Sequence, residues 1–162
     1  MTSLKIGRFE TLEALIDVLI ASGILMKVKS YGKTYGSTRK TPKLLFIAPS
    51  LRTAILDNIY LTGIEGNKIE DYLALVYMSD LKDKIAVDLS YDIAEEGADF
   101  ILTLKDRTKI VIEVGFNKED TRQVTNTQAK VNGKYGLVFG SKKLDLIDDF
   151  IVKIPLEYLL LI

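Results

Sequence analysis

The sequence predicts an α/β fold in which a mixed central sheet is flanked by helices. Apolar residues make up 48% of the 162 residues, which is enough to bury a core, and 27% are charged. From residue 68 to residue 154 the apolar periodicity changes in the order helix, three strands, helix, strand, strand. No apolar run reaches the length that spans a bilayer. We therefore expect a soluble, cytoplasmic domain without a membrane partner.

The N-terminal elements predict a partial winged helix. Residues 9–22 place apolar side chains at helical spacing, and residues 24–31 alternate apolar with basic residues, as a strand does. A polar loop follows, and then a second strand at 43–48. A helix followed by a long basic hairpin is typical of the C-terminal end of a winged-helix module, so we assign residues 1–47 to such a segment. Four apolar side chains of the helix are expected in the core: Leu12, Leu15, Ile16 and Leu19.

The remaining residues, 48–162, are expected to form a second domain. Its predicted elements are helices at 49–59 and 68–81, strands at 85–91, 97–104 and 109–116, a helix at 119–132, strands at 135–139 and 150–154, and a short helix after Pro155. Asp106 and Arg107 form a turn signal between the second and third of these strands, which predicts a hairpin.

The composition excludes several kinds of catalytic site. The chain has no cysteine and no histidine, so thiolate and imidazole nucleophiles, bases and zinc ligands are absent. The phosphate-binding motif G-x-x-x-x-G-K-[ST] is also absent, so we expect no ATP site. Any catalysis must come from carboxylates, lysines, hydroxyls or a metal held by oxygen ligands.

Two acidic residues lie in apolar strands on either side of the predicted hairpin. Asp99 begins one strand, and Glu113 lies within the next. Burying a carboxylate is unfavourable unless it is paired, protonated or bound to a metal. In a hairpin the two side chains would be neighbours, and Mg²⁺ prefers such oxygen ligands. Asp99 and Glu113 are thus candidate metal ligands, although pairing with Lys109 or Lys130 would equally explain them.

Basic residues are concentrated near the N-terminus. Residues 18–56 contain seven Lys or Arg and no Asp or Glu. A cluster of this kind favours contact with phosphates, although a solvated loop has the same composition. We predict DNA contacts from four of these residues: Lys33, Arg39, Lys40 and Lys43. Tyr31 and Tyr35 are candidates for packing on sugar or base.

Five segments together carry a resemblance to a known family. They are Pro42–Arg52, Ile69–Leu75, Ala98–Leu102, Ile112–Val114 and Ile154–Leu156. In this order they resemble the C-terminal region of archaeal and bacterial AAA-type ATPases. There an ATPase module is followed by a winged helix and a restriction-endonuclease-like domain of the PD-(D/E)XK type.

The resemblance implies a restriction-endonuclease-like fold and a nuclease site. Asp99 and Glu113 match its metal-binding acids, and Glu70 matches an accessory acid on the preceding helix, although a surface acid would also fit there. The family's lysine, two residues after the glutamate, is Gly115 in this sequence. Lys118 is the candidate replacement. Strict alternation places it on the opposite strand face unless the chain bends after Gly115.

Three functions remain open from the sequence. The leading hypothesis is a non-catalytic DNA-binding or regulatory domain of an AAA-type ATPase, with a degenerate nuclease core. The second is an active Mg²⁺-dependent nuclease that uses Glu70, Asp99, Glu113 and Lys118. The third is a protein-interaction module that forms a homo-oligomer. Because no ATPase motif is present, the chain is interpreted as a C-terminal fragment or a stand-alone relative.

Overall fold

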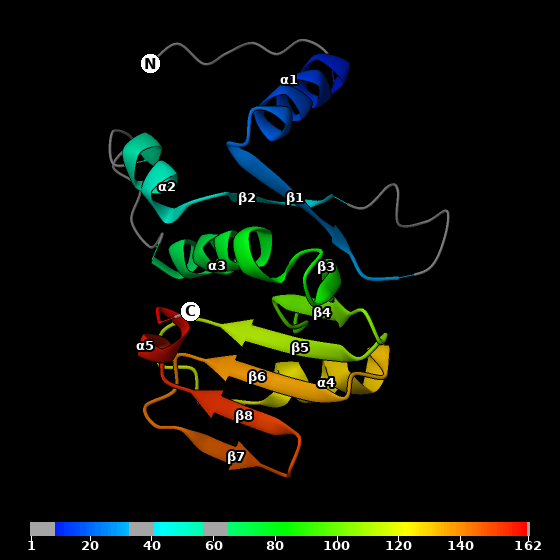
Figure 1. Ribbon diagram of the computed structural model, residues 1–162, viewed down its shortest axis with the longest axis vertical. Helices are drawn as coiled ribbons and strands as arrows, with labels where there is room; N and C mark the ends of the chain where they lie inside the picture. The colour runs from blue at the N-terminus through cyan, green and yellow to red at the C-terminus, as the bar shows by residue number, and fades with distance from the viewer. Residues whose placement is uncertain (1–8, 33–40, 57–64, 162) are drawn as a thin grey trace.

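The protein is an α/β structure built on one mixed sheet (Figure 1). The computed structural model describes residues 9–32, 41–56 and 65–161. The helices in these ranges are α1 Phe9–Ala21, α2 Pro49–Leu56, α3 Glu65–Val76, α4 Arg122–Val131 and α5 Leu156–Leu159. The strands there are β1 Leu25–Ser30, β2 Lys43–Phe46, β3 Ala86–Tyr91, β4 Phe100–Leu104, β5 Lys109–Val114, β6 Tyr135–Phe139, β7 Asp145–Ile147 and β8 Ile151–Ile154.

The order of the strands in the sheet is β2-β1-β3-β4-β5-β6-β8-β7. β3, β4 and β5 form an antiparallel meander, and β5, β6 and β8 run parallel to one another. The predicted hairpin is confirmed, since β4 pairs with β5 in a register that sets Phe100 opposite Ile112. Its turn contains Arg107 at a φ of 69°.

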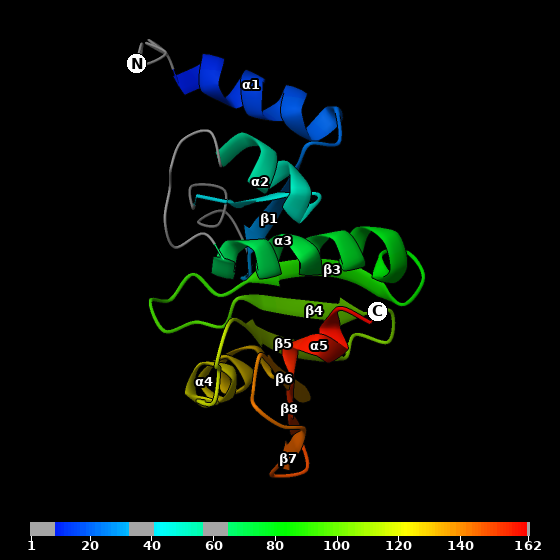
Figure 2. The same ribbon diagram turned by 90° about the vertical axis from the view of Figure 1, so that its left-hand side faces the viewer.

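Helices cover both faces of the sheet (Figure 2). Side chains of α3 and α5 pack on one face, in a cluster that includes Phe100 and Leu102. Val124 and Val131 of α4 pack on the other face, with Ile101. Neighbouring residues of β4 thus alternate between two cores, as the period of two in a strand requires. The strand is buried on both sides, so an acid beside it sits where water is scarce.

The predicted winged-helix segment is continuous with the rest of the fold. β1 pairs parallel with β3, with Lys29 opposite Ser90. Met26, Val28 and Leu45 belong to the same core cluster as α3. The residues on either side of position 47 therefore share a sheet and a core, while the division into two domains stays a prediction.

The expected burial of the first helix is only partly observed. Leu12 and Leu15 are 38% and 45% exposed, so their prediction as core residues is wrong. Ile16 and Leu19 are half-buried. The reason is the position of α1 beyond the end of β1, where only its C-terminal half approaches the sheet (Figure 1).

Two further details differ from the sequence prediction. The helix expected over 68–81 is α3 followed by a π-helical turn, Tyr77–Leu81. The short edge strand β7 was not predicted at all. None of the helices in the described ranges is long and apolar enough to cross a membrane.

Candidate functional site

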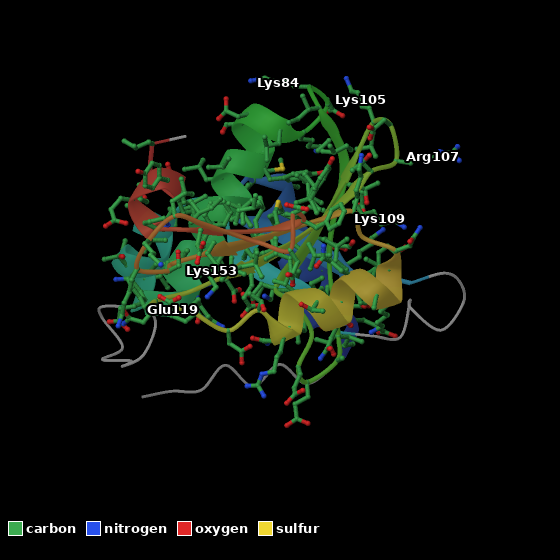
Figure 3. The ribbon with its side chains drawn as sticks, turned by 90° about the horizontal axis from the view of Figure 1, so that it is seen from below. Lys84, Lys105, Arg107, Lys109, Glu119 and Lys153 are labelled. Atoms are coloured by element: carbon green, nitrogen blue, oxygen red, sulfur yellow. The ribbon has the colours of Figure 1, made fainter. Side chains whose placement is uncertain are left out.

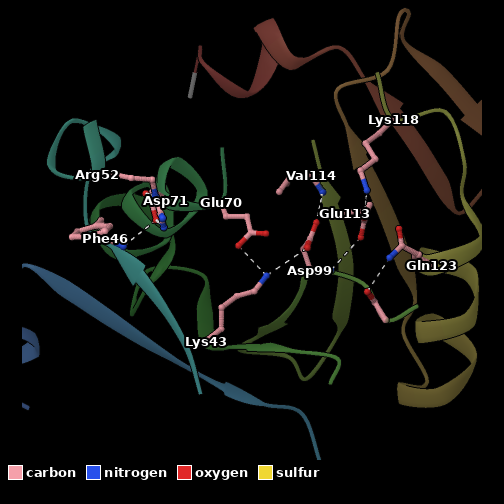
Figure 4. Close-up of polar contacts among 11 residues, drawn as sticks. Lys43, Phe46, Arg52, Glu70, Asp71, Asp99, Glu113, Val114, Lys118 and Gln123 are labelled. Atoms are coloured by element: carbon pink, nitrogen blue, oxygen red, sulfur yellow. Dashed lines mark hydrogen bonds and ion pairs between the residues drawn. The ribbon is translucent and has the colours of Figure 1, made fainter. Parts of the chain in front are cut away.

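The two strand acids meet at the open end of the β4–β5 hairpin (Figure 4). Continuing the register of the hairpin by one residue sets Asp99 opposite Glu113. The Asp99 backbone N–H donates to Oε2 of Glu113 at 3.2 Å, and the Val114 N–H donates to Oδ2 of Asp99 at 3.0 Å. The Glu113 side chain is 2% exposed and that of Asp99 is 21% exposed. Their predicted proximity is therefore observed.

Lys118 reaches the same site. Its ammonium forms an ion pair with Oε1 of Glu113. A turn after β5 brings it there, because Asn117 has a φ of 52°, a left-handed conformation that asparagine tolerates. The turn is held to the end of β6, where the Lys118 N–H donates to the Gly140 carbonyl at 3.1 Å. Strict alternation along the strand would have placed Lys118 on the opposite face. Because the chain turns at Asn117, the alternation does not continue to residue 118.

The glycine at position 115 makes room for Lys118. A Cβ built on Gly115 would lie 2.7 Å from Cε and 3.1 Å from Cγ of Lys118. Any side chain at position 115 would thus displace the stem of this lysine. The glycine at 115 and the lysine at 118 are therefore complementary in space.

Lys43 is the site residue that sequence reasoning assigned to another role. Its Nζ lies 3.0 Å from Oε2 of Glu70, on α3, and 3.5 Å from Oδ1 of Asp99. It also lies 4.7 Å from the centroid of the Phe100 ring. Instead of standing free for phosphate, Lys43 bridges two acids. The clue in the sequence was a lysine directly before the apolar run Leu44–Phe46.

Burial and like charge act on the carboxylates of the site. Desolvation raises the pKa of Glu113, the charge of Asp99 raises it further, and Lys118 lowers it without reversing the shift. The pKa of Glu70 is also raised, by desolvation first, while Lys43 opposes the shift. For Lys118, desolvation lowers the pKa, but the hydrogen bond and charge of Glu113 outweigh it, so the net pKa is raised. The cluster therefore favours bound cations.

The alternative partners considered from the sequence are wrong. Lys109 donates to the Val131 carbonyl at 2.7 Å, and Lys130 pairs with the buried Asp92. Asp92 also accepts a hydrogen bond from Oγ1 of Thr127 at 3.1 Å. Thr127 in turn accepts from the Ala98 N–H at 3.0 Å, directly before Asp99. This network attaches α4 to the loop that leads into the site.

The polar helix α4 also contacts that loop. Gln123 donates through Nε2 to the Gly97 carbonyl at 3.3 Å (Figure 4). A Cβ on Gly97 would lie 2.6 Å from Cβ of Asp92, so the close approach of this loop requires glycine. The position of Asp99 is thus fixed from both sides, by the β5 backbone and by α4.

Three of the four predicted DNA-binding residues belong to a range that the structure does not describe. Lys33, Arg39 and Lys40 lie outside the described residues, as does Tyr35. Tyr31 is half-buried against the α4 core cluster, and Nζ of Lys109 lies 5.4 Å from its ring centroid.

The oxygen ligands at the site fit a hard divalent cation in type. Asp99 and Glu113 present carboxylate oxygens side by side, which Mg²⁺ and Mn²⁺ prefer. Within the ranges that the structure describes, no three acidic side chains converge as a metal-binding group. An ion held by Asp99 and Glu113 would therefore need water or backbone carbonyls as further ligands, as Mg²⁺ commonly has.

Comparison with known proteins gives one relative and no function. No family model matches the chain, and no solved structure matches it. The chain is 33% identical over 135 residues to an uncharacterized protein of Methanocaldococcus jannaschii. The match covers 82% of this chain and 28% of that protein, so the chain spans less than a third of its relative's length.

Proposed function

We propose that this chain is a divalent-metal-dependent nuclease domain of the PD-(D/E)XK type, whose active-site lysine has moved from position 115 to position 118. The observation that carries the proposal is the Lys118 ammonium on Glu113, with the stem of the lysine lying in the space left by Gly115. The order α3-β3-β4-β5-α4-β6 supports the restriction-endonuclease-like core that the sequence resemblance implies.

Each residue has a role that its position supports. Asp99 and Glu113 would hold the cation, and Lys118 would orient and polarise the attacking water beside them. A bound Mg²⁺ supplies charge neutralisation at the phosphate and lowers the pKa of coordinated water. Water adds to phosphorus and one P–O ester bond breaks, which leaves an alcohol and a phosphomonoester while a proton passes to solvent. Glu70 is an accessory acid at the edge of the site.

Cleavage of DNA tests the proposal. Plasmid, linear duplex and single-stranded DNA are incubated with the protein and Mg²⁺ or Mn²⁺, and product is measured against time. Lys118→Met removes the ammonium and keeps the apolar stem, so we expect the cleavage rate to fall roughly 100-fold or more. Lys84→Met is the matched control, because Lys84 pairs with the exposed Asp80 instead.

The control lies far from the site. Figure 3 shows Lys84 and Arg107 at the end of the sheet opposite Glu119 and Lys153, and Glu119 directly follows Lys118 in the chain. Absence of cleavage of all three substrates with both metals would contradict the nuclease proposal. Equal activity of the Lys118→Met and Lys84→Met variants would contradict the role of Lys118.

A second function is favoured by Lys43. Its ammonium neutralises Glu70 and Asp99. A nuclease core that has lost its metal would also need a positive charge beside these two acids. On this proposal the domain binds DNA without cutting it, as the cytoplasmic C-terminal part of an AAA-type ATPase, with phosphate contacts from Lys33, Arg39 and Lys40. DNA binding that weakens when these three become Ala, together with no cleavage, would support it. A stable homo-oligomer without DNA affinity would instead favour an interaction module.

A further inference from the structure

Lys43 occupies a position that is chemically equivalent to that of a bound cation. It extends from β2 to carboxylates on two other elements, Glu70 on α3 and the Asp99 that precedes β4. Figure 4 shows its Nζ between these two side chains, with Asp99 in turn beside Glu113. One positive charge is thus shared by two acids, and one of these acids is a candidate metal ligand.

The need for a cation at this place follows from the electrostatics. All three acidic side chains are at most 21% exposed, and Asp99 lies close enough to Glu70 and to Glu113 to raise the pKa of each. Without a cation, neighbouring carboxylates in a poorly hydrated site repel one another. Lys43 reduces that repulsion in the absence of metal, as a divalent ion would.

The contacts of Lys43 are of a kind that can be exchanged. Its side chain is 23% exposed, and its distance to Asp99 is 3.5 Å, which is long for a charge-assisted hydrogen bond. Lysine is a point charge on a flexible stem, so it can turn away without breaking a fixed pair of bonds. The Phe100 ring, 4.7 Å from Nζ, provides a further contact for the ammonium beside the site.

We propose that Lys43 is an internal cation that competes with a divalent metal for Asp99, so that metal binding requires the ammonium to leave this carboxylate. The inference rests on the metal site of the proposed function, and it concerns how that site is regulated. Its consequence is a site that is neutralised and stable without metal, with an affinity for Mg²⁺ below what its acids alone would give.

Calorimetric titration of Mg²⁺ and Mn²⁺ into the purified chain tests the competition. Lys43→Met removes the charge and keeps the apolar stem, so we expect the metal to bind about tenfold more tightly than in the unmodified protein. Lys43→Arg keeps the charge and should bind metal within about threefold of the unmodified protein, by the same reasoning. Lys84→Met changes the net charge equally at the far end of the sheet and should leave the affinity unchanged.

A second readout uses the unmodified protein. The NMR signal of the Lys43 ε-methylene, assigned by its loss in Lys43→Arg, should shift as Mg²⁺ is added and saturate at the calorimetric affinity. The corresponding signal of Lys84 should not move. This measurement keeps the proposal testable even where Lys43→Met fails to fold.

The outcomes separate the inference from the proposed function. Tighter binding in Lys43→Met, with a Lys43 signal that follows saturation, supports the competition. Equal affinities in Lys43→Met and the unmodified protein, or a static Lys43 signal at saturation, overturn the competition and leave the metal site intact. No binding in any variant overturns both. If the metal binds in competition with Lys43 but DNA is not cleaved, the inference is supported and only the nuclease proposal is contradicted.

Discussion

Among the clusters in the described residues that pair buried acids with basic residues, two are built differently. In the first, Arg52 of α2 and Asp71 of α3 form two hydrogen bonds, from Nε to Oδ2 at 2.5 Å and from Nη2 to Oδ1 at 2.9 Å. The Phe46 N–H adds a third to Asp71 at 2.9 Å. The second cluster is the site, where Lys43 and Lys118 face Glu70, Asp99 and Glu113.

The difference separates a structural ion pair from an exchangeable one. Asp71 is 0% exposed, and a planar guanidinium holds it in a fixed two-pronged geometry. The basic residues of the site are lysines with side chains 23% and 33% exposed, each a single charge on a flexible stem. A cation from solution can replace a lysine of this kind, whereas replacing Arg52 would leave a fully buried charge unpaired. Adjacent acids in the sequence, Glu70 and Asp71, thus have opposite roles.

Breaking the structural pair has the largest expected effect on stability. Arg52→Met leaves Asp71 buried without its partner, so we expect the free energy of unfolding to fall by about 3–5 kcal/mol. Urea unfolding followed by circular dichroism measures it. The double variant Arg52→Met/Asp71→Leu should regain part of the loss, because no charge is then buried. A loss below about 1 kcal/mol in the single variant would show that the pair is not structural.

The Asp92 network is expected to have the next largest effect. Its pKa is lowered, because the hydrogen bonds from Lys130, Ala94 and Thr127 outweigh desolvation. A lowered pKa stabilises the fold above the ordinary value of 3.8, and this contribution is lost as the pH falls through the folded-state pKa. Asp92→Asn should therefore lower the free energy of unfolding by about 1–3 kcal/mol at pH 7.

Unfolding measured against pH checks the sign of this prediction. The difference in the free energy of unfolding between Asp92→Asn and the unmodified protein should narrow as the pH falls below 3.8 and through the folded-state pKa of Asp92. Below that pKa, Asp92 is protonated in both the folded and the unfolded chain. A difference in the free energy of unfolding that stays constant from pH 7 to pH 2 would mean that the carboxylate charge of Asp92 does not contribute to stability.

Removing the charge of a site acid should change stability little. The raised pKa of Glu113 means that its ionised form is disfavoured in the fold. This unfavourable contribution is fully present above the folded-state pKa and disappears below the ordinary value of 4.5. In Glu113→Gln the loss of the Lys118 pair is offset by the removal of a buried charge, so stability at pH 7 should change by less than about 1 kcal/mol.

The same variant should abolish metal binding. Calorimetry on Glu113→Gln with Mg²⁺ is the companion measurement, and it separates a site acid from a structural one. A stability loss above about 2 kcal/mol with metal binding retained would place Glu113 in the structural class with Asp71.

The smallest effect is expected at an exposed pair. Lys84 and Asp80 are an i,i+4 pair with side chains 62% and 50% exposed. Water and salt screen such pairs, so Lys84→Met should leave the unfolding midpoint unchanged within error. A clear drop in the midpoint would mean that exposure does not separate weak from strong pairs in this chain.

The sequence was sufficient for the features that depend on local patterns. Alternation located β4 and β5, and the turn signal at Asp106 and Arg107 located their hairpin. Together these features placed Asp99 beside Glu113. The edge strand β7 was missed, because three residues are too few to carry a periodic signal.

The contacts that the sequence could not establish are those between distant segments. Lys118 reaches Glu113 because Asn117 turns the chain and Gly140, directly after β6, fixes the turn. Lys43 reaches Glu70 and Asp99 because the hairpin of β1 and β2 joins the sheet beside β3. Neither contact follows from spacing along the chain. The acids and Lys118 could be named from the sequence, but the turn that brings Lys118 to Glu113 and the position of Lys43 could not.

Diffraction from crystals soaked in Mn²⁺ shows whether a metal ion binds to Asp99 and Glu113 and displaces Lys43, because the anomalous signal locates the ion directly. We expect one strong peak within about 2.5 Å of oxygens from both Asp99 and Glu113, with Lys43 turned away from Asp99. No peak at these residues at saturating Mn²⁺, with Lys43 still between Glu70 and Asp99, would contradict this expectation.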